Sequence, residues 1–488
     1  MQPMFDRSSI DRRKFLQDSF CGFGSLALAT MLNDEQSRAA ANPLAPRPPH
    51  RSGGKAKSVI FLFMGGGPSH LETFDPKPLL NKLNGQVRPK QFAAVDYQRI
   101  KQGAKLLGSK RKFHKRGECG VEVSDLFPLT GDCIDDIAVI RSCYGDKVVH
   151  SAAQYELFSG RTVPGFPSMG SWVVYGLGSE SDSLPAYIVM PDPDGALPAG
   201  QPMYMNGFLP AVYQPTMFRP GPKPVRNLDL PRGVSLSQRR KTIDLIRRLN
   251  RANLSRRDDE LSARISTYEL AFKMQTEAPE LFDVSGETKE TLQLYGIGSE
   301  PTDDYGRRCL LARRLVERGV RFSVVVSGGG AATTQWDAHT DIEENHLRMA
   351  RETDRPVAGL LKDLKRRGLL DSTLVVWGGE FGRSPEAQGG KGRDHHNTGF
   401  SMWLAGGGVK GGQAVGATDD IGLHAVQDRC HFRDIHTTIL HLLGLDQDEL
   451  SYQHLGRRER LTLVHGSVIQ QIVTKAESGR RKAEETAN

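Results

Sequence analysis

Three short segments of the chain combine carboxylate and imidazole side chains, and each adjoins a predicted β-strand. The segments are 337–339, 380–383 and 394–396. Carboxylate oxygens and imidazole nitrogens that converge from separate loops are the ligands that proteins use for zinc, manganese or calcium. We therefore expect a divalent metal site, with the candidate ligands Asp337, His339, Glu380, Asp394, His395 and His396.

Each segment also has a simpler interpretation on its own. Asp337 and His339 fit a turn that ends in a surface histidine, and Glu380 fits an ion pair with Arg383. Segment 394–396 is more diagnostic, because two histidines beside an aspartate in a glycine-rich loop rarely serve packing. The metal hypothesis therefore depends on whether the fold brings the three segments together.

The hydrophobic pattern predicts a sheet that would do this. Residues 58–63 form a continuous apolar run suited to a central parallel strand. Further strands are predicted at 137–140, 186–190, 320–326, 373–377 and 400–405, and helices at 305–318, 345–367 and 434–443. This alternation predicts an α/β fold with a mostly parallel sheet between helices. Loops at the carboxyl ends of such strands meet at one edge, so we expect the three segments in one pocket there.

The composition and charge of the chain indicate which kinds of binding partner to expect. The 488 residues carry a net charge of +8, with 38% hydrophobic and 25% charged residues, as in a globular protein. No run of Lys and Arg alternates with aromatic residues, so nucleic acid is not an expected partner. The diffuse basic excess is compatible with an anionic substrate. The basic helical stretch 235–274 is interpreted as part of an insertion at about 225–300 with a solvated charged face.

The N-terminal segment resembles an export signal. Arg12 and Arg13 precede a short apolar stretch, 20–32, and three alanines at 39–41 follow as a cleavage site. We expect a twin-arginine leader at 1–41, a linker at 42–57, the folded domain at 58–473 and a frayed tail at 474–488. The leader implies the twin-arginine translocase as a partner and an extracytoplasmic location, in the periplasm or outside the cell. The apolar stretch is shorter than the ~20 residues of a membrane span, so no stable span is expected. A basic amphipathic helix and an uncleaved anchor are the alternatives.

The six cysteines do not form a thiolate metal site, because none belongs to a C-x-x-C pair. Cys21 lies in the expected leader. Cys119 could form a disulfide with Cys133 or Cys143 in an oxidising compartment, and scattered buried thiols are the alternative.

Several motifs together resemble one known family. Most of 58–446 is similar to a bacterial twin-arginine-exported family of unknown function placed in the alkaline phosphatase and sulfatase superfamily. The matching motifs are Gly66 to His70, Thr73 to Pro78, His150 to Arg161, Pro167 to Trp172, Trp336 to His339, Gly379 to Pro385 and Gly392 to Asn397. The resemblance implies an alkaline-phosphatase-like domain and a metal-dependent hydrolase of phosphate or sulfate esters, acting on small anionic or glycan substrates of the envelope.

The resemblance also implies roles for three further residues. Residues 150–161 are similar in layout to the sulfatase nucleophile motif, in which the nucleophile falls on His150. His150 or the adjacent Ser151 would then be the nucleophile or acid/base, and Arg383 would clamp an oxyanion. The helix N-terminus would lower the pKa of His150. The alternative is that His150 caps or packs the helix, with Ser151 as the N-cap.

The chain departs from sulfatases at several positions. Met64 and Gly65 stand where sulfatases have an aspartate after the first strand, and Glu380 and Phe381 replace an Asp-His pair. No cysteine lies in a C-x-P-x-R context, which argues against formylglycine chemistry. Glu72 or Asp75 is a candidate replacement for the first carboxylate. The rival hypothesis is a non-catalytic envelope binding or scaffold protein that keeps the fold without the complete active site.

Overall fold

The structure is a computed structural model that describes residues 42–474, apart from 93–96, 102, 220, 222–223, 226–229, 231–232, 253–267, 276–279 and 332–333. Its centre is a nine-stranded sheet. In spatial order the sheet runs β12 (Gln413–Val415), β4 (Ile137–Tyr144), β11 (Phe400–Ala405), β8 (Thr373–Gly378), β1 (Ser58–Met64), β7 (Phe322–Ser327), β5 (Tyr187–Met190) and β6 (Thr216–Met217), and β15 (Cys430–His431) also pairs with β4.

Strand direction agrees with the expected fold class. β11 runs antiparallel to both of its neighbours, and the other pairings in this sheet are parallel. In the central register, Leu62 of β1 lies opposite Val325 of β7 and Trp377 of β8. The prediction of an α/β fold with a mostly parallel sheet between helices is confirmed.

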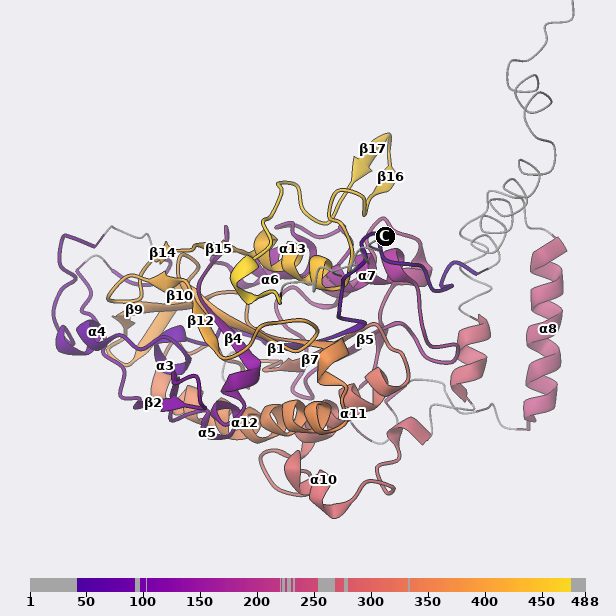
Figure 1. Ribbon diagram of the computed structural model, residues 1–488, viewed down its shortest axis with the longest axis horizontal. Helices are drawn as coiled ribbons and strands as arrows, with labels where there is room; N and C mark the ends of the chain where they lie inside the picture. The colour runs from indigo at the N-terminus through magenta and orange to yellow at the C-terminus, as the bar shows by residue number, and fades with distance from the viewer. Residues whose placement is uncertain are drawn as a thin grey trace, which may run out of the picture.

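Helices cover both faces of the sheet (Figure 1). They are α6 (His150–Ser159), α7 (Met169–Leu177) and α13 (Phe432–Leu442) on one face, and α11 (Asp303–Glu317) and α12 (Ile342–Arg366) on the other. Alternate residues of β1 pack into the hydrophobic cores on the two opposite faces of the sheet, because successive side chains of a strand point to opposite faces. Phe61 and Phe63 pack with α6, α7 and α13, whereas Ile60 and Leu62 pack with α11 and α12. Burial on both faces explains why β1 is a continuous apolar run.

Shorter elements surround the sheet. The most important for the site is a hairpin of β9 (Gly382–Gln388) and β10 (Gly392–His396) between β8 and β11. The other two-stranded sheets are β2 (Phe113–Arg116) with β3 (Val121–Ser124), β13 (Ala417–Thr418) with β14 (Ala425–Gln427), and β16 (Tyr452–His454) with β17 (Arg457–Glu459). Further α-helices include α3 (His70–Thr73), α4 (Pro78–Lys82), α5 (Pro128–Gly131), α8 (Leu236–Ala252) and α10 (Lys289–Leu294).

Most element boundaries agree with the sequence pattern. The strand predicted at 400–405 has the bounds of β11. Gly319 and Gly368 follow α11 and α12 with φ of +79° and +69°, the left-handed conformation that ends a helix. In the expected insertion, α8 is helical as predicted, whereas 253–267 and the leader at 1–41 lie outside the described residues. The domain boundaries remain predictions.

For the described residues, the structure distinguishes between a disulfide and free cysteine thiols. Cys119, Cys133, Cys143, Cys309 and Cys430 are all free thiols, so the disulfide considered for Cys119 is not formed. Cys119 is exposed, whereas Cys133 and Cys143 are buried in separate cores, which leaves the scattered-thiol interpretation. No described helix is long and apolar enough to cross a membrane.

Candidate metal centre

The carboxyl edge of the sheet brings the candidate residues together. Asp337 and His339 follow β7, and His150 begins α6 shortly after β4. His395 lies on β10, just before β11. Because β11 is antiparallel, its first residue, Phe400, pairs with Cys143 near the end of β4. The residues that precede β11 therefore reach the same edge as the residues that follow the parallel strands.

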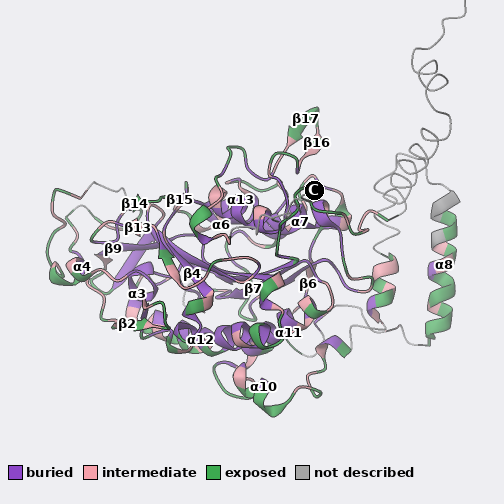
Figure 2. Ribbon diagram, in the orientation of Figure 1, coloured by how far each residue is buried: buried purple, intermediate pink, exposed green. Residues whose placement is uncertain are grey.

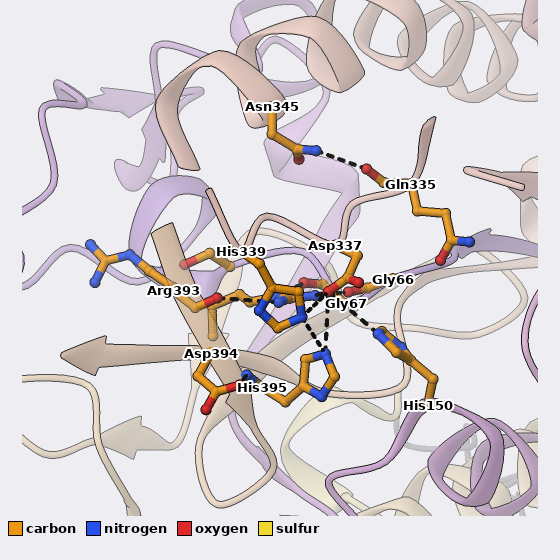
Figure 3. A network of polar contacts seen from close by, with 12 residues as sticks. Gly66, Gly67, His150, Gln335, Asp337, His339, Asn345, Arg393, Asp394 and His395 are labelled. Atoms are coloured by element: carbon orange, nitrogen blue, oxygen red, sulfur yellow. Dashed lines mark hydrogen bonds and ion pairs between the residues drawn. The ribbon is translucent and has the colours of Figure 1, made fainter. Parts of the chain in front are cut away.

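Four side chains converge at this edge. His150, Asp337, His339 and His395 each offer one ligand atom, and these atoms all lie within 4.8 Å of one another (Figure 3). Asp337 Oδ1 lies 2.9 Å from His339 Nε2, 3.2 Å from His395 Nε2 and 3.4 Å from His150 Nε2. Atoms that share an ion at about 2.0–2.2 Å are expected to lie roughly 3 to 3.5 Å apart. The spacing therefore suits a metal centre.

The hydrogen bonds at Nδ1 favour the same tautomer in each of the three imidazoles when the ring is neutral. In each ring Nδ1 faces an oxygen acceptor: Glu380 Oε1 at 2.7 Å from His150, Gln388 Oε1 at 2.6 Å from His339 and Val148 O at 3.0 Å from His395. An oxygen acceptor requires the proton on Nδ1, so a neutral ring keeps its lone pair on Nε2. Metal-bound histidines show this pattern, donating the other ring N–H to a carboxylate or carbonyl. Three Nε2 lone pairs and one carboxylate oxygen thus face one another.

Within the described chain, the ring of His150 has a buried nitrogen without a hydrogen bond, which fits a cation at this centre. Its Nε2 is buried and has no hydrogen-bond partner among the described residues. Asp337 Oδ1 lies 3.4 Å from this nitrogen and carries no proton to donate when ionised. An unpaired buried acceptor costs about 1–3 kcal/mol, and a shared metal ion would remove that cost.

Electrostatics keep Asp337 and His395 in the form that binds metal, whereas His150 holds its proton more tightly than a free imidazole. Burial raises the pKa of Asp337, but the Arg383 guanidinium and the three imidazoles hold it well below its usual range. Burial lowers the pKa of His395 to about 3, so this ring is neutral at pH 7. Burial also lowers the pKa of His150, but Asp337 and Glu380 more than offset this and raise it above its ordinary value. The lowered pKa expected for His150 from its helix position is therefore wrong.

Arg383 holds the carboxylate of Asp337 in place. Its side chain is fully buried, and Nη2 donates to Asp337 Oδ1 at 2.5 Å. Nε and Nη2 also donate to the carbonyls of Gly67 and Gly66, and Nη1 donates to the carbonyl of Arg393. These bonds occupy the guanidinium, so its position fits an anchor for Asp337 better than the predicted oxyanion clamp. Gly66 is required here, because a Cβ on it would lie 2.7 Å from the Asp337 backbone nitrogen.

Glu380 lies behind His150 rather than among the ligand atoms. Its buried Oε1 accepts from His150 Nδ1, from Gln154 Nε2 at 2.9 Å and from the Gly66 N–H at 3.1 Å. With three donors, this oxygen is committed to the protein. The structure therefore places Glu380 beside the predicted ligands as the residue that orients His150.

Two other predicted ligands point away from the centre. The β9–β10 pairing is irregular between Arg393 and His395, and of the side chains of Asp394, His395 and His396 only that of His395 is in the cluster. Asp394 accepts from the backbone N–H groups of His395 and Arg99. His396 is fully buried, and its Nε2 bonds the Leu423 carbonyl. Neither is in the four-residue cluster.

The remaining candidates are also placed elsewhere. Glu72 pairs with the buried Arg393 at 2.7 Å, and Asp75 pairs with Lys77 at 3.0 Å, so neither replaces the missing carboxylate after β1. The N-cap of α6 is Val149, and His150 and Ser151 are its first two residues. The suggestion that Ser151 caps the helix is therefore wrong. Among the described contacts, none joins Ser151 to the cluster.

A second cluster, of one histidine and two carboxylates, has a hydrogen-bond pattern that does not favour metal binding. His431, Asp146 and Glu156 lie together in a cavity of about 570 Å³. His431 Nδ1 accepts from the Arg433 N–H at the start of α13. The proton must then be on Nε2, which lies 3.2 Å from Asp146 Oδ1 and 3.3 Å from Glu156 Oε1. No imidazole lone pair is left for a metal, in contrast to the three rings above.

With the fold and site in view, this is an α/β protein with a buried His/Asp cluster able to hold a metal ion at its sheet edge. The chain belongs to the family described as protein of unknown function DUF1501, whose profile matches residues 56–473. No curated protein matches it.

Several solved structures are similar at a distance. They include the lipoteichoic acid synthase LtaP from Listeria monocytogenes, with 10% identity, TM-score 0.35 and coverage of 90% of this chain and 82% of that one. The PsFucS1 sulfatase from Pseudoalteromonas sp. has 13% identity, TM-score 0.35 and coverage of 85% and 72%. An alkaline phosphatase from the Antarctic bacterium TAB5 has 10% identity, TM-score 0.33 and coverage of 81% and 99%. Likeness this distant carries no information about the chemistry of the present site.

Proposed function

We propose that His150, Asp337, His339 and His395 bind a divalent metal ion, and that the protein uses it to hydrolyse a phosphate or sulfate ester. The observation that carries the proposal is the convergence of three imidazole Nε2 atoms on one carboxylate oxygen. Three imidazoles favour zinc or a similar transition metal over calcium, which prefers oxygen ligands.

The residues around the ligands have separable tasks in this proposal. Arg383 fixes the Asp337 carboxylate, and Glu380 fixes the His150 ring with its lone pair toward the centre. A metal ion in such a site supplies Lewis acidity to an ester oxygen and lowers the pKa of water. Asp337, His150 and His339 keep roughly a tenth of their side-chain surface exposed (8%, 12% and 11%), which leaves the centre open to water.

The ester class rests on the sequence resemblance to the phosphatase and sulfatase superfamily. No described contact gives Ser151 a base in the cluster, so water is the favoured nucleophile. Glycans of the cell envelope are the proposed source of the ester, because the N-terminal pattern supports export through the twin-arginine route to an extracytoplasmic compartment.

A non-catalytic role is the second candidate, and one observation favours it. Structural zinc sites have four protein ligands, whereas catalytic sites keep a position open for water. The cluster offers four protein ligands. A scaffold or binding protein of the envelope would then use the metal only for stability.

One experiment separates the two candidates. The purified full chain is analysed for metal content and assayed on aryl phosphate, aryl phosphodiester and aryl sulfate substrates, beside His395→Ala. Hydrolysis that requires stoichiometric metal and disappears in His395→Ala supports the hydrolase. Stoichiometric metal that raises the unfolding temperature without turnover of any substrate supports the structural role. A chain that binds no divalent metal contradicts both.

A further inference from the structure

Helix α8 carries a concentrated positive charge. Its 17 residues, Leu236–Ala252, include six basic side chains and a single acidic one, Asp244. The basic residues are Arg239, Arg240, Lys241, Arg247, Arg248 and Arg251. The helix therefore has a net charge of +5, more than half of the +8 of the whole chain. Figure 1 shows it at one end of the molecule, beyond the helices that cover the sheet.

An apolar stripe runs along the same helix. Leu245 and Leu249 are one turn apart and so lie on one face, and they are 50% and 57% exposed. Ile243, which lies on the opposite side of the helix from Leu245, is only 5% exposed. Figure 2 shows most of α8 as exposed. The helix thus uses one apolar face for packing and presents a second to solvent.

Basic side chains border the exposed stripe. Lys241 precedes Leu245 by four residues and Arg248 follows it by three, so both lie next to it on the helix surface. Both are exposed. Leucines flanked by cations are typical of helices that lie in a membrane interface, where the apolar side enters the acyl boundary and the cations meet lipid phosphates.

We propose that α8 docks on an anionic lipid surface, lying parallel to it. Charge complementarity selects this occupant, because a +5 helix repels a second copy of itself and attracts acidic phospholipid headgroups. Nucleic acid would use the cations but would leave Leu245 and Leu249 in water. Docking by α8 is independent of the metal centre, and it would hold the sheet domain beside the membrane without a spanning helix.

The test is co-sedimentation of the full chain with vesicles. One set contains phosphatidylcholine alone, and the other contains equal amounts of phosphatidylcholine and phosphatidylglycerol. Binding is expected only to the anionic set and is expected to weaken in high salt. The double change Leu245→Gln and Leu249→Gln should lower the partition coefficient about tenfold or more. The double change Lys241→Gln and Arg248→Gln should lower it about thirtyfold, since each cation near an anionic surface contributes about fivefold.

Controls isolate α8 from the rest of the chain. Glutamine is a good helix former, so circular dichroism of the variants should match the parent. Ser237→Gln, which leaves the stripe and the charges intact, should bind like the parent. All variants share residues 1–41, so a difference between them reports on α8.

Several outcomes would overturn the proposal. They are equal binding to both vesicle sets, no binding at all, or full binding by the leucine variant. A dimer that dissociates when the leucines are changed would assign the stripe to a second copy. Binding of a duplex oligonucleotide that persists in the leucine variant, without vesicle binding, would assign the basic face to nucleic acid.

Discussion

The Nδ1 atom of His150 lies 2.7 Å from Oε1 of the fully buried Glu380, and this bond sets the direction of the ring. Because the carboxylate accepts, Nδ1 carries a proton, and Nε2 is directed toward the centre, 3.4 Å from Asp337 Oδ1. The first residue of α6 and the loop after β8 thereby act as one unit. The metal affinity of His150 should depend on a residue that never touches the metal.

Replacing Glu380 by glutamine tests this dependence. Glu380 Oε1 serves three donors, and an amide brings a competing N–H into a site built only of donors. Metal affinity, measured by competition with a chromogenic chelator, should fall about 10- to 100-fold. Glu344→Gln, at an exposed position on α12, is the matched control and should keep the parent affinity. Equal affinity in Glu380→Gln would show that the His150 orientation is set elsewhere.

Replacing Arg383 by lysine tests its role as an anchor. The buried guanidinium binds Asp337 and three backbone carbonyls, and an ammonium group cannot span them. The free energy of unfolding of the metal-free protein, from urea titration, should fall by about 3 kcal/mol. Arg355→Lys, on the exposed side of α12, should change it by less than about 0.5 kcal/mol. A similar small change in both variants would mean that Asp337 is held without Arg383.

A buried histidine far from the centre predicts how stability depends on pH. Burial lowers the pKa of His436 to about 4, although its Nε2 bonds the Leu157 carbonyl at 2.7 Å. The folded-state pKa lies below the unfolded value of 6.5, so the unfolded chain takes up the proton first as pH falls. This contribution is complete above pH 6.5 and is lost toward pH 4, at about 1.4 kcal/mol per pH unit.

His436→Gln should therefore reduce the slope of unfolding free energy against pH by about one proton in that window. Urea titrations at several pH values from 4 to 7 measure it. An unchanged slope would mean that His436 is protonated in the folded protein.

The sequence correctly predicted that the three segments lie at the carboxyl edge of the sheet, because strands β7, β8 and β11 were recognisable from their apolar runs. The pattern could not separate His395 from Asp394 and His396. Segment 394–396 was expected to be a loop, and loop geometry excludes none of its three side chains as a metal ligand. The segment is instead the strand β10, in which Asp394 accepts from a backbone N–H and His396 bonds the Leu423 carbonyl, so only His395 joins the centre.

His150 was noticed for a different role. The family resemblance implies a nucleophile or acid/base at the start of a helix, and the structure places the residue among the candidate ligands. Its partner Glu380 is 230 residues away, so no local spacing could reveal the bond. Arg383 was expected to pair with Glu380 or to clamp an oxyanion, and its bonds to Gly66, Gly67 and Asp337 could not be foreseen because these residues are far away in sequence.

Export can be tested apart from the site. The double substitution Arg12→Lys and Arg13→Lys should leave the precursor in the cytoplasmic fraction. The reason is that the twin-arginine route depends on the arginine pair. Cell fractionation and the size of the mature chain measure this. Export of the double variant at the parent level would remove the twin-arginine route, though not export itself.

The most direct measurement of the central claim is the metal content of three purified proteins by elemental analysis: the parent, His395→Ala and His396→Ala. These neighbouring histidines are both buried, but only His395 Nε2 joins Asp337 and His339. The claim predicts stoichiometric divalent metal in the parent and in His396→Ala, and less than a tenth of it in His395→Ala. Full metal content in His395→Ala, or none in the parent, would contradict it.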